Sequence, residues 1–181
     1  MPNLKPIFPK FVYTETLNLS DNYNNEIKSE IIKLLKNKDP SASPYSITDF
    51  KTKDSEEIIK NPTFAPPFAM IRENIDMCCR GLNFQNKFKI VNAWINITPP
   101  GKYHDVHKHI GSAISGVYYV QADPPMQLNF IYDGVLDIEN QSEDLHAKKL
   151  ILFDSTLSHG FTHVNINEEP KITIAFNCVP L

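Results

Sequence analysis

The sequence predicts a mainly β fold with helices in its N-terminal half, an α+β arrangement whose core is an antiparallel β-sandwich or barrel. Three observations lead to this prediction. Helical periodicity is confined to residues 1–85. From residue 86 onward come short runs that are rich in β-branched and aromatic residues. Clusters of Pro, Gly, Asp and Asn separate these runs at nearly even spacing. We find no internal repeat, so we expect one domain over residues 1–181, with 1–85 as helical support and 86–181 as the β core.

The first half carries three helix signals. A helix is expected over residues 20–36, because Ser and Asp at its start are good N-caps and its Ile and Leu residues recur on one side. A short helix is expected at 55–60. A third is expected at 68–80, where apolar residues repeat every three to four positions and Gly81 follows as a common stop signal. The intervening residues 39–53 predict a surface loop.

The second half carries five strand signals. The stretch FKIVNAWINI alternates apolar and polar residues, as a half-buried strand does, and we expect its Trp94 to belong to the core. The later runs are shorter and more continuously apolar. The five expected strands cover residues 88–97, 113–120, 126–133, 149–154 and 171–179.

Composition excludes several classes of function. The chain has 181 residues, 41% of them apolar, and a formal net charge of −3, so no strong basic field is present to bind nucleic acid or an anionic membrane. The N-terminus lacks the apolar core of a signal peptide, and no apolar run is long enough to span a bilayer. We therefore expect a cytoplasmic protein. Its three cysteines include no Cys-x-x-Cys pair and are expected to be reduced and buried.

The histidines point to a metal site. All six follow residue 103, and His107 and His109 stand at positions i and i+2, which share one face of an extended segment. Two imidazoles so placed can bind one metal ion. A third ligand must come from elsewhere, and the best candidate is His159, directly after a strongly apolar strand. Three protein ligands that leave positions open are typical of a catalytic metal site.

The other three histidines are expected to lie outside the ligand set. His104 is three residues from His107, and in a regular strand the two would point to opposite faces. His146 stands among charged residues and predicts a solvated loop. His163 is four residues from His159, but its surroundings are not helical, so we expect it near the site or exposed.

One segment resembles a known family. WINITPPGKYHDVHKHIGSAISGVYYV is similar to the iron- and 2-oxoglutarate-dependent oxygenases, in particular to their small bacterial and phage branch, in which H-x-H is followed by SGVYYV. LILFDSTLSHGF resembles the strand and turn that carry the family's distal histidine, and KITIAFN resembles its closing strand. The similarity extends over residues 88–179, in the family's order. It implies a double-stranded β-helix (jelly-roll) core and a general likeness to prolyl hydroxylase-like enzymes.

The resemblance also implies ligands and cosubstrates. It implies Fe(II) as the metal, 2-oxoglutarate as a cosubstrate that chelates it, and O₂ as the oxidant. By position, the iron ligands are His107, His109 and His159. Around 2-oxoglutarate, the resemblance places Lys171, Tyr119, Thr173 and Asn96, with the ammonium of Lys171 paired to the far carboxylate. The expected reaction is hydroxylation of an unactivated C–H bond in a small-molecule or peptide substrate that the sequence does not identify.

Two features depart from the family's usual pattern. Most members of the wider superfamily use two histidines and one carboxylate, but this chain contains no His-x-Asp or His-x-Glu. Three neutral imidazoles leave the metal one positive charge richer. The second departure is Lys171 where the small branch usually has Arg. Lysine supplies a point charge in place of a bidentate fork, so carboxylate pairing is retained with less geometric control.

Two alternatives remain at this stage. One is a cupin-type metal dioxygenase that uses no 2-oxoglutarate, because the spacing from Gly101 to His107 fits half of the first cupin motif. Against it, residues 113–114 are Ala and Ile where that motif has Glu. The other is a non-catalytic jelly-roll binding module that has lost the metal chemistry.

Overall fold

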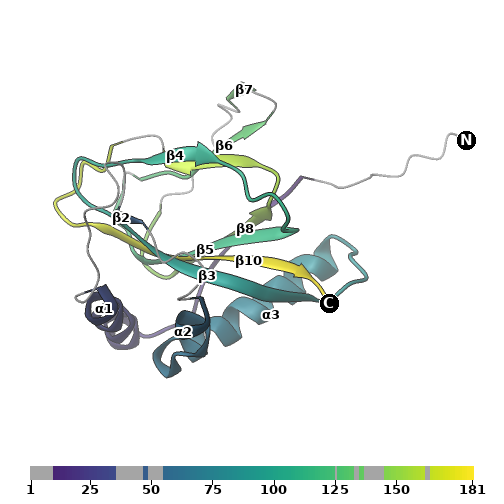
Figure 1. The fold of residues 1–181 in the computed structure, drawn as a ribbon, viewed down its shortest axis with the longest axis horizontal. Coiled ribbons are helices and arrows are strands. Elements are labelled where there is room, and N and C mark those ends of the chain that lie inside the picture. The colour runs from purple at the N-terminus through teal and green to yellow at the C-terminus, as the bar shows by residue number, and fades with distance from the viewer. Residues whose placement is uncertain are drawn as a thin grey trace, which may run out of the picture.

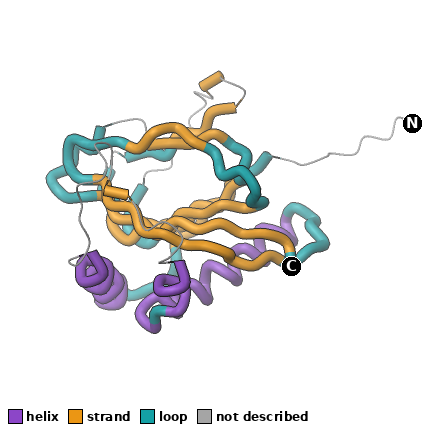
Figure 2. The backbone as a smooth tube through the Cα atoms, in the orientation of Figure 1, coloured by secondary structure: helices purple, strands orange, loops and turns teal. Residues whose placement is uncertain are grey.

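The computed structural model describes residues 10–35, 47–48, 55–124, 126–132, 135–136, 145–161 and 164–181. These residues form two antiparallel sheets that face each other, with helices on one side (Figures 1 and 2). The six-stranded sheet has, in spatial order, β1 (Val12–Thr16), β8 (Lys149–Asp154), β5 (Ile114–Gln121), β10 (Lys171–Pro180), β3 (Phe88–Thr98) and β2 (Ile47–Thr48). The four-stranded sheet has β4 (His104–His107), β9 (Ser158–Phe161), β6 (Asn129–Tyr132) and β7 (Val135–Leu136).

From β3 onward the chain alternates between the two sheets. β3, β5, β8 and β10 belong to the large sheet, and the segments between them supply β4, β6 with β7, and β9 to the small sheet. A chain that crosses from one sheet to the other after each strand or hairpin winds as a double-stranded β-helix. The expected jelly-roll core is therefore confirmed.

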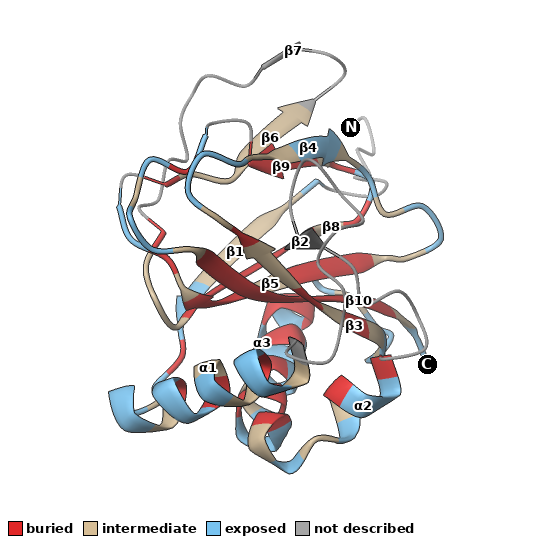
Figure 3. Ribbon diagram, turned by 60° about the vertical axis from the view of Figure 1, so that its left-hand side comes forward, coloured by how far each residue is buried: buried red, intermediate tan, exposed pale blue. Residues whose placement is uncertain are grey.

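The helices cover the outer face of the large sheet (Figures 1 and 3). They are α1 (Asp21–Leu35), α2 (Ser55–Lys60), a 3₁₀ turn at Pro62–Phe64 and α3 (Ala65–Gly81). Figure 3 shows their buried sides turned toward the sheet and their exposed sides toward solvent. One apolar cluster fills this layer, and a second, which includes Phe153 and Phe161, fills the space between the sheets. The large sheet is thus covered on both faces, which explains why β8 and β10 are almost continuously buried.

A buried polar contact fixes α1 on the sheet. The hydroxyl of Tyr118 donates to Oδ1 of Asn24 over 2.7 Å, and Nδ2 of Asn24 donates to the carbonyl of Val120, also over 2.7 Å. Tyr118 is fully buried and Asn24 nearly so. Because both polar groups of Asn24 are satisfied, a polar residue is tolerated beneath the helix. Tyr118 therefore faces α1, and its neighbour Tyr119 faces the space between the sheets.

The predicted elements occur with small shifts. The three expected helices form, but the third ends later than expected: Leu82 is its C-cap, and the left-handed residue is Asn83, with φ of 55°, in place of Gly81. The five expected strands form, and β1 and β2 join the large sheet from the first half, which was expected to be helical. Most of the predicted loop 39–53 lies outside the described residues, apart from β2. Cys78, Cys79 and Cys178 are free and buried, as expected. No helix in the described part of the chain has the length and apolar character needed to cross a membrane.

Candidate metal centre and its cavity

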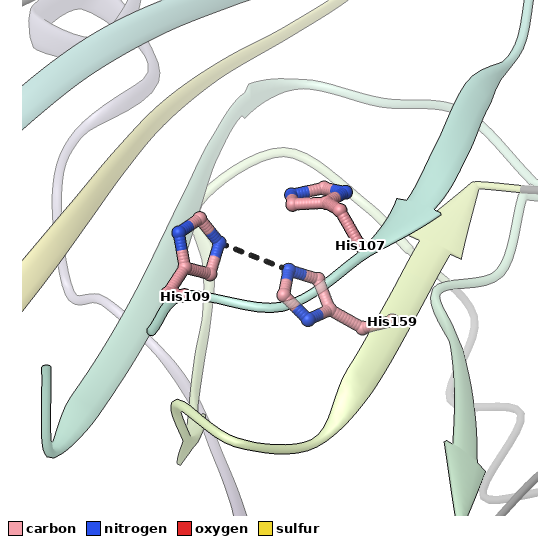
Figure 4. Close-up of side chains that lie close together, drawn as sticks. All are labelled: His107, His109 and His159. Atoms are coloured by element: carbon pink, nitrogen blue, oxygen red, sulfur yellow. Dashed lines mark hydrogen bonds between the residues drawn. The ribbon is translucent and has the colours of Figure 1, made fainter. Parts of the chain in front are cut away.

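Three histidine side chains converge between the two sheets (Figure 4). His107 ends β4, His109 follows it by two residues, and His159 lies on the adjacent strand β9, directly opposite His107. One ring nitrogen from each of the three residues lies within 4.8 Å of the others. The structure thus brings together the three histidines that the sequence pattern singled out.

Backbone carbonyls orient two of these rings. Nδ1 of His107 lies 2.8 Å from the carbonyl oxygen of Asp105, and Nδ1 of His159 lies 2.9 Å from that of Leu157. A carbonyl oxygen only accepts hydrogen bonds, so Nδ1 carries the proton in each ring. In the neutral ring this leaves the lone pair on Nε2, on the side that faces the other histidines. Metal-ligating histidines are oriented in this way.

Burial keeps two of the rings neutral. Removal from water lowers the pKa of His159 to about 3, and the hydrogen bond to Leu157 opposes this only in part. Burial, with the nearby His107, lowers the pKa of His109 to about 4. Only a neutral imidazole has a lone pair for a metal, so both rings are ready to bind one near neutral pH.

The spacing of the nitrogens fits one shared cation. Nε2 of His109 and Nε2 of His159 are 3.2 Å apart. Two imidazole nitrogens bound at about 2.1 Å to one ion lie about 3.0 Å apart in octahedral geometry and about 3.4 Å apart in tetrahedral geometry. The observed distance falls between these values. The residues present therefore fit a divalent metal ion, held from one side and with its other side open to the cavity.

The opposite wall of the cavity belongs to the large sheet. Thr173 on β10 pairs with Asn96 on β3 and with Tyr119 on β5, so these three side chains form one row across three adjacent strands. All three line the same cavity as the histidines, and so does Lys171, one inward-facing position before Thr173 on β10. The four residues that the family resemblance assigned to 2-oxoglutarate thus face the histidine triad from the other sheet.

Lys171 is an unusual charge in this wall. Its side chain is only 6% exposed, and its Nζ lies 3.8 Å from the centroid of the Phe161 ring. Within the described part of the chain, no carboxylate pairs with it. Burial lowers its pKa to about 7, since the charged form has lost its hydration. A bound anion would restore a partner to this ammonium group.

The other polar groups of the row also lack partners. Oδ1 of Asn96 is buried and makes no hydrogen bond. The hydroxyls of Tyr119 and Thr173, both in buried residues, make none with the described part of the chain either. Buried polar groups are normally hydrogen-bonded. Several unpaired groups around one buried cation therefore suit a ligand that carries a carboxylate.

A fourth histidine also lines this cavity, which corrects a sequence-based expectation. On β4, His104 pairs with Phe161 and His107 pairs with His159, so three residue steps on β4 match two on β9. This β-bulge turns His104 to the same side as His107, and their ring centroids are 4.8 Å apart. The expectation of opposite faces assumed a regular strand. No signal in the sequence marked the bulge except the glycine at position 160.

Gly160 makes the bulge possible. An added Cβ there would lie 2.9 Å from Cα of Val106 and 3.1 Å from the carbonyl carbon of Asp105. Because these are backbone atoms, no side-chain rotation relieves the overlap. The β4 backbone thus crosses over a position on β9 that has no side chain.

Three further residues were singled out in the sequence: Trp94, His146 and His163. Trp94 packs against the apolar core, as expected. It also lines the cavity, with its ring centroid 5.3 Å from that of His109, because it shares the inner face of β3 with Asn96. His146 is partly buried away from the cavity, and its Nε2 lies 3.5 Å from Oγ1 of Thr16. His163 lies outside the described residues.

Comparisons with known proteins agree with this arrangement. Residues 92–177 match the family model described as "Putative 2OG-Fe(II) oxygenase". Among solved structures, a prolyl-4-hydroxylase from Pseudomonas putida aligns at a TM-score of 0.59 and 16% identity, over 92% of this chain and 91% of that one. HygX from Streptomyces hygroscopicus, with nickel and 2-oxoglutarate bound, aligns at 0.60 and 11%, over 93% and 82%.

A viral collagen prolyl hydroxylase from Paramecium bursaria Chlorella virus-1, in complex with 2-oxoglutarate, aligns at a TM-score of 0.54 and 14% identity, over 93% of this chain and 96% of that one. At these identities the likeness establishes the fold. No curated protein matches the sequence significantly.

Proposed function

From the match of residues 92–177 to the Fe(II)- and 2-oxoglutarate-dependent oxygenases, we propose that the chain is an enzyme of this family that hydroxylates an unactivated C–H bond, with His107, His109 and His159 as the iron ligands. The observation that carries this proposal is the meeting of two features in one cavity: the histidine triad on the small sheet and the buried ammonium of Lys171 on the large one. The first suits a divalent metal and the second suits the far end of a dicarboxylate.

The histidines would hold Fe(II) from one side. Nε2 of each backbone-oriented ring presents its lone pair toward the common centre, so little rearrangement is needed on binding. All three ligands are neutral, so the bound ion keeps its full charge of about +2. A dianionic cosubstrate offsets this charge, which supports 2-oxoglutarate as the second component of the site.

The large sheet would hold the cosubstrate. Lys171, Tyr119 and Thr173 line this cavity. The ammonium of Lys171 would pair with the far carboxylate, and the two hydroxyls would donate to it. Asn96 contacts it from the same row, with the amide turned to present either its oxygen or its nitrogen. Each of these groups gains the partner that it lacks in the structure.

Bound iron with 2-oxoglutarate supplies the oxidation of the C–H bond by O₂, with decarboxylation of the cosubstrate to succinate. The chain itself positions the metal and the cosubstrate and keeps water away from them. The small sheet fixes the metal, the large sheet fixes the cosubstrate, and the apolar residues between the sheets, among them Phe161 and Val117, exclude stray water.

The expected substrate is a small molecule or a peptide. The net charge of −3 does not favour nucleic acid. Three reduced and buried cysteines support a reducing compartment, the cytoplasm.

The test is an anaerobic titration of the protein with Fe(II) and then with 2-oxoglutarate, followed by exposure to O₂. We expect a visible charge-transfer absorption that requires both components, because it arises from the keto acid chelating the metal. After O₂ is admitted, succinate should form even without substrate, at a slow uncoupled rate. A protein that binds iron but yields neither the absorption nor succinate would favour the cupin-type alternative.

A further inference from the structure

The position of His104 within the cavity is the starting point. The β-bulge in β4 places its ring beside that of His107, with the centroids 4.8 Å apart, yet His104 is not one of the three residues whose nitrogens converge on a common centre. Its side chain therefore lines the cavity next to the metal centre without belonging to it.

The cross-strand neighbour of His104 shows which part of the cavity the ring occupies. His104 pairs with Phe161 on β9, and Phe161 carries the ammonium group of Lys171 above its ring, 3.8 Å from the centroid. His104 thus lies on the Lys171 side of the triad. A ligand that reaches from the metal toward Lys171 would therefore lie on the side of the cavity that His104 lines.

The chemistry of the ring suits that place. An imidazole carries at least one N–H in every protonation state, and an N–H donates readily to a carboxylate. Lys171 alone supplies a point charge with no fixed direction. A second donor on the opposite sheet would fix the carboxylate from the other side and so supply part of the geometric control that a lysine lacks.

We propose that His104 is a cosubstrate-binding residue, whose imidazole N–H donates a hydrogen bond to the far carboxylate of 2-oxoglutarate, opposite Lys171. This rests on the proposed function of the site. It gives His104 a role in cosubstrate affinity and selectivity and none in holding the metal.

The test compares two keto acids and two substitutions of nearly equal shape. 2-Oxopentanoate has the same chelating group as 2-oxoglutarate but lacks the far carboxylate. His104→Gln keeps an N–H donor, and His104→Met has similar length without one. Affinities for Ni(II), and then for each keto acid on the nickel-loaded full chain, are measured by calorimetry, and cooperative thermal melting checks that each variant is folded.

We expect His104→Met to lower the affinity for 2-oxoglutarate at least tenfold. The affinities of this variant for Ni(II) and for 2-oxopentanoate should stay within twofold of wild type. His104→Gln should recover most of the loss for 2-oxoglutarate. Three results for His104→Met would overturn the proposal: an equal loss of affinity for both keto acids, a tenfold loss of affinity for nickel, or an unchanged affinity for 2-oxoglutarate. If the wild type binds nickel but no 2-oxoglutarate, the proposed function itself fails, an outcome distinct from the others.

Discussion

Nε2 of His109 lies 3.2 Å from Nε2 of His159, although 50 residues separate them in the chain. His159 donates through Nδ1 to a backbone carbonyl, so its Nε2 presents a lone pair to the other ring. The two nitrogens are spaced as neighbouring ligands of one ion are. This pair joins the segment that follows β4 to strand β9 through a prospective metal. The predictions below follow from this pair and from the cavity wall on the large sheet that faces it.

Loss of one histidine of the triad should abolish tight metal binding. His159→Ala removes a buried ligand and leaves two, so we expect the affinity for Fe(II) or Ni(II) to fall by a factor of about 100 or more. His146→Ala is the matched control, because this histidine lies outside the cavity. The metal affinity of the His146→Ala variant should equal that of wild type. Calorimetry on protein stripped of metal measures both. Equal binding by wild type and His159→Ala would remove the triad as the site.

The affinity for 2-oxoglutarate should fall with rising pH above about 7. In the folded chain without cosubstrate, burial lowers the pKa of Lys171 to about 7 from its ordinary 10.5. Above that pH the lysine is neutral and must take up a proton to pair with the carboxylate. The dissociation constant should therefore rise about tenfold per pH unit between pH 7.5 and 8.5, because one proton is bound with the ligand.

Lys171→Arg provides the control for this pH dependence. A guanidinium stays charged at all these pH values. The affinity of the Lys171→Arg variant for 2-oxoglutarate should therefore change little between pH 6.5 and 8.5. Calorimetry on nickel-loaded protein measures both series. A wild type whose affinity is constant over this range would contradict the role given to Lys171.

The adjacent tyrosines of β5 should separate stability from cosubstrate binding. Tyr118→Phe leaves Oδ1 of Asn24 buried without its donor, so it should lower the free energy of unfolding by about 1–3 kcal/mol. Its affinity for 2-oxoglutarate should not change, because this side chain faces α1. Denaturant unfolding and calorimetry measure the two effects.

Tyr119→Phe should show the opposite pattern. It removes a hydroxyl that faces the cavity and has no partner in the described part of the chain, so little stability is lost. A hydrogen bond to a charged group contributes about 1.5–3 kcal/mol, so 2-oxoglutarate should bind about 10- to 100-fold more weakly. If both variants lost cosubstrate affinity equally, the assignment of faces on β5 would be wrong.

Gly160→Ala should damage both the fold and the site. The new methyl group would meet the backbone of Val106 at 2.9 Å, so β4 must move away from β9. We expect a lower melting temperature, and weaker binding of both metal and 2-oxoglutarate, because the bulge positions His107 and His104. Gly101→Ala is a useful comparison: its φ is 76°, so strain is expected there too, but an added Cβ meets no atom within 4 Å. Its metal affinity should remain close to that of wild type.

The sequence by itself determined the three helices, five of the strands and the types of residue at the site. Periodicity predicted the helices and the main strands, because the spacing of apolar residues along the sequence depends on whether one face or both faces of an element are buried. The i, i+2 spacing of His107 and His109, the apolar strand before His159 and the family resemblance together predicted the three histidines that the structure brings close to one another. The family resemblance assigned Lys171 and its row to the cosubstrate.

Only the tertiary structure decided which side chains meet in one cavity. Tyr118 faces the helices and Tyr119 faces the small sheet. Alternation along β5 shows only that the two side chains point to opposite faces, and it does not show which layer covers each face. His104 was expected to point away from His107, because a regular strand alternates faces. The bulge over Gly160 reverses this, and such a bulge depends on how closely two backbones approach, a property of the paired strands that neither strand's sequence records alone.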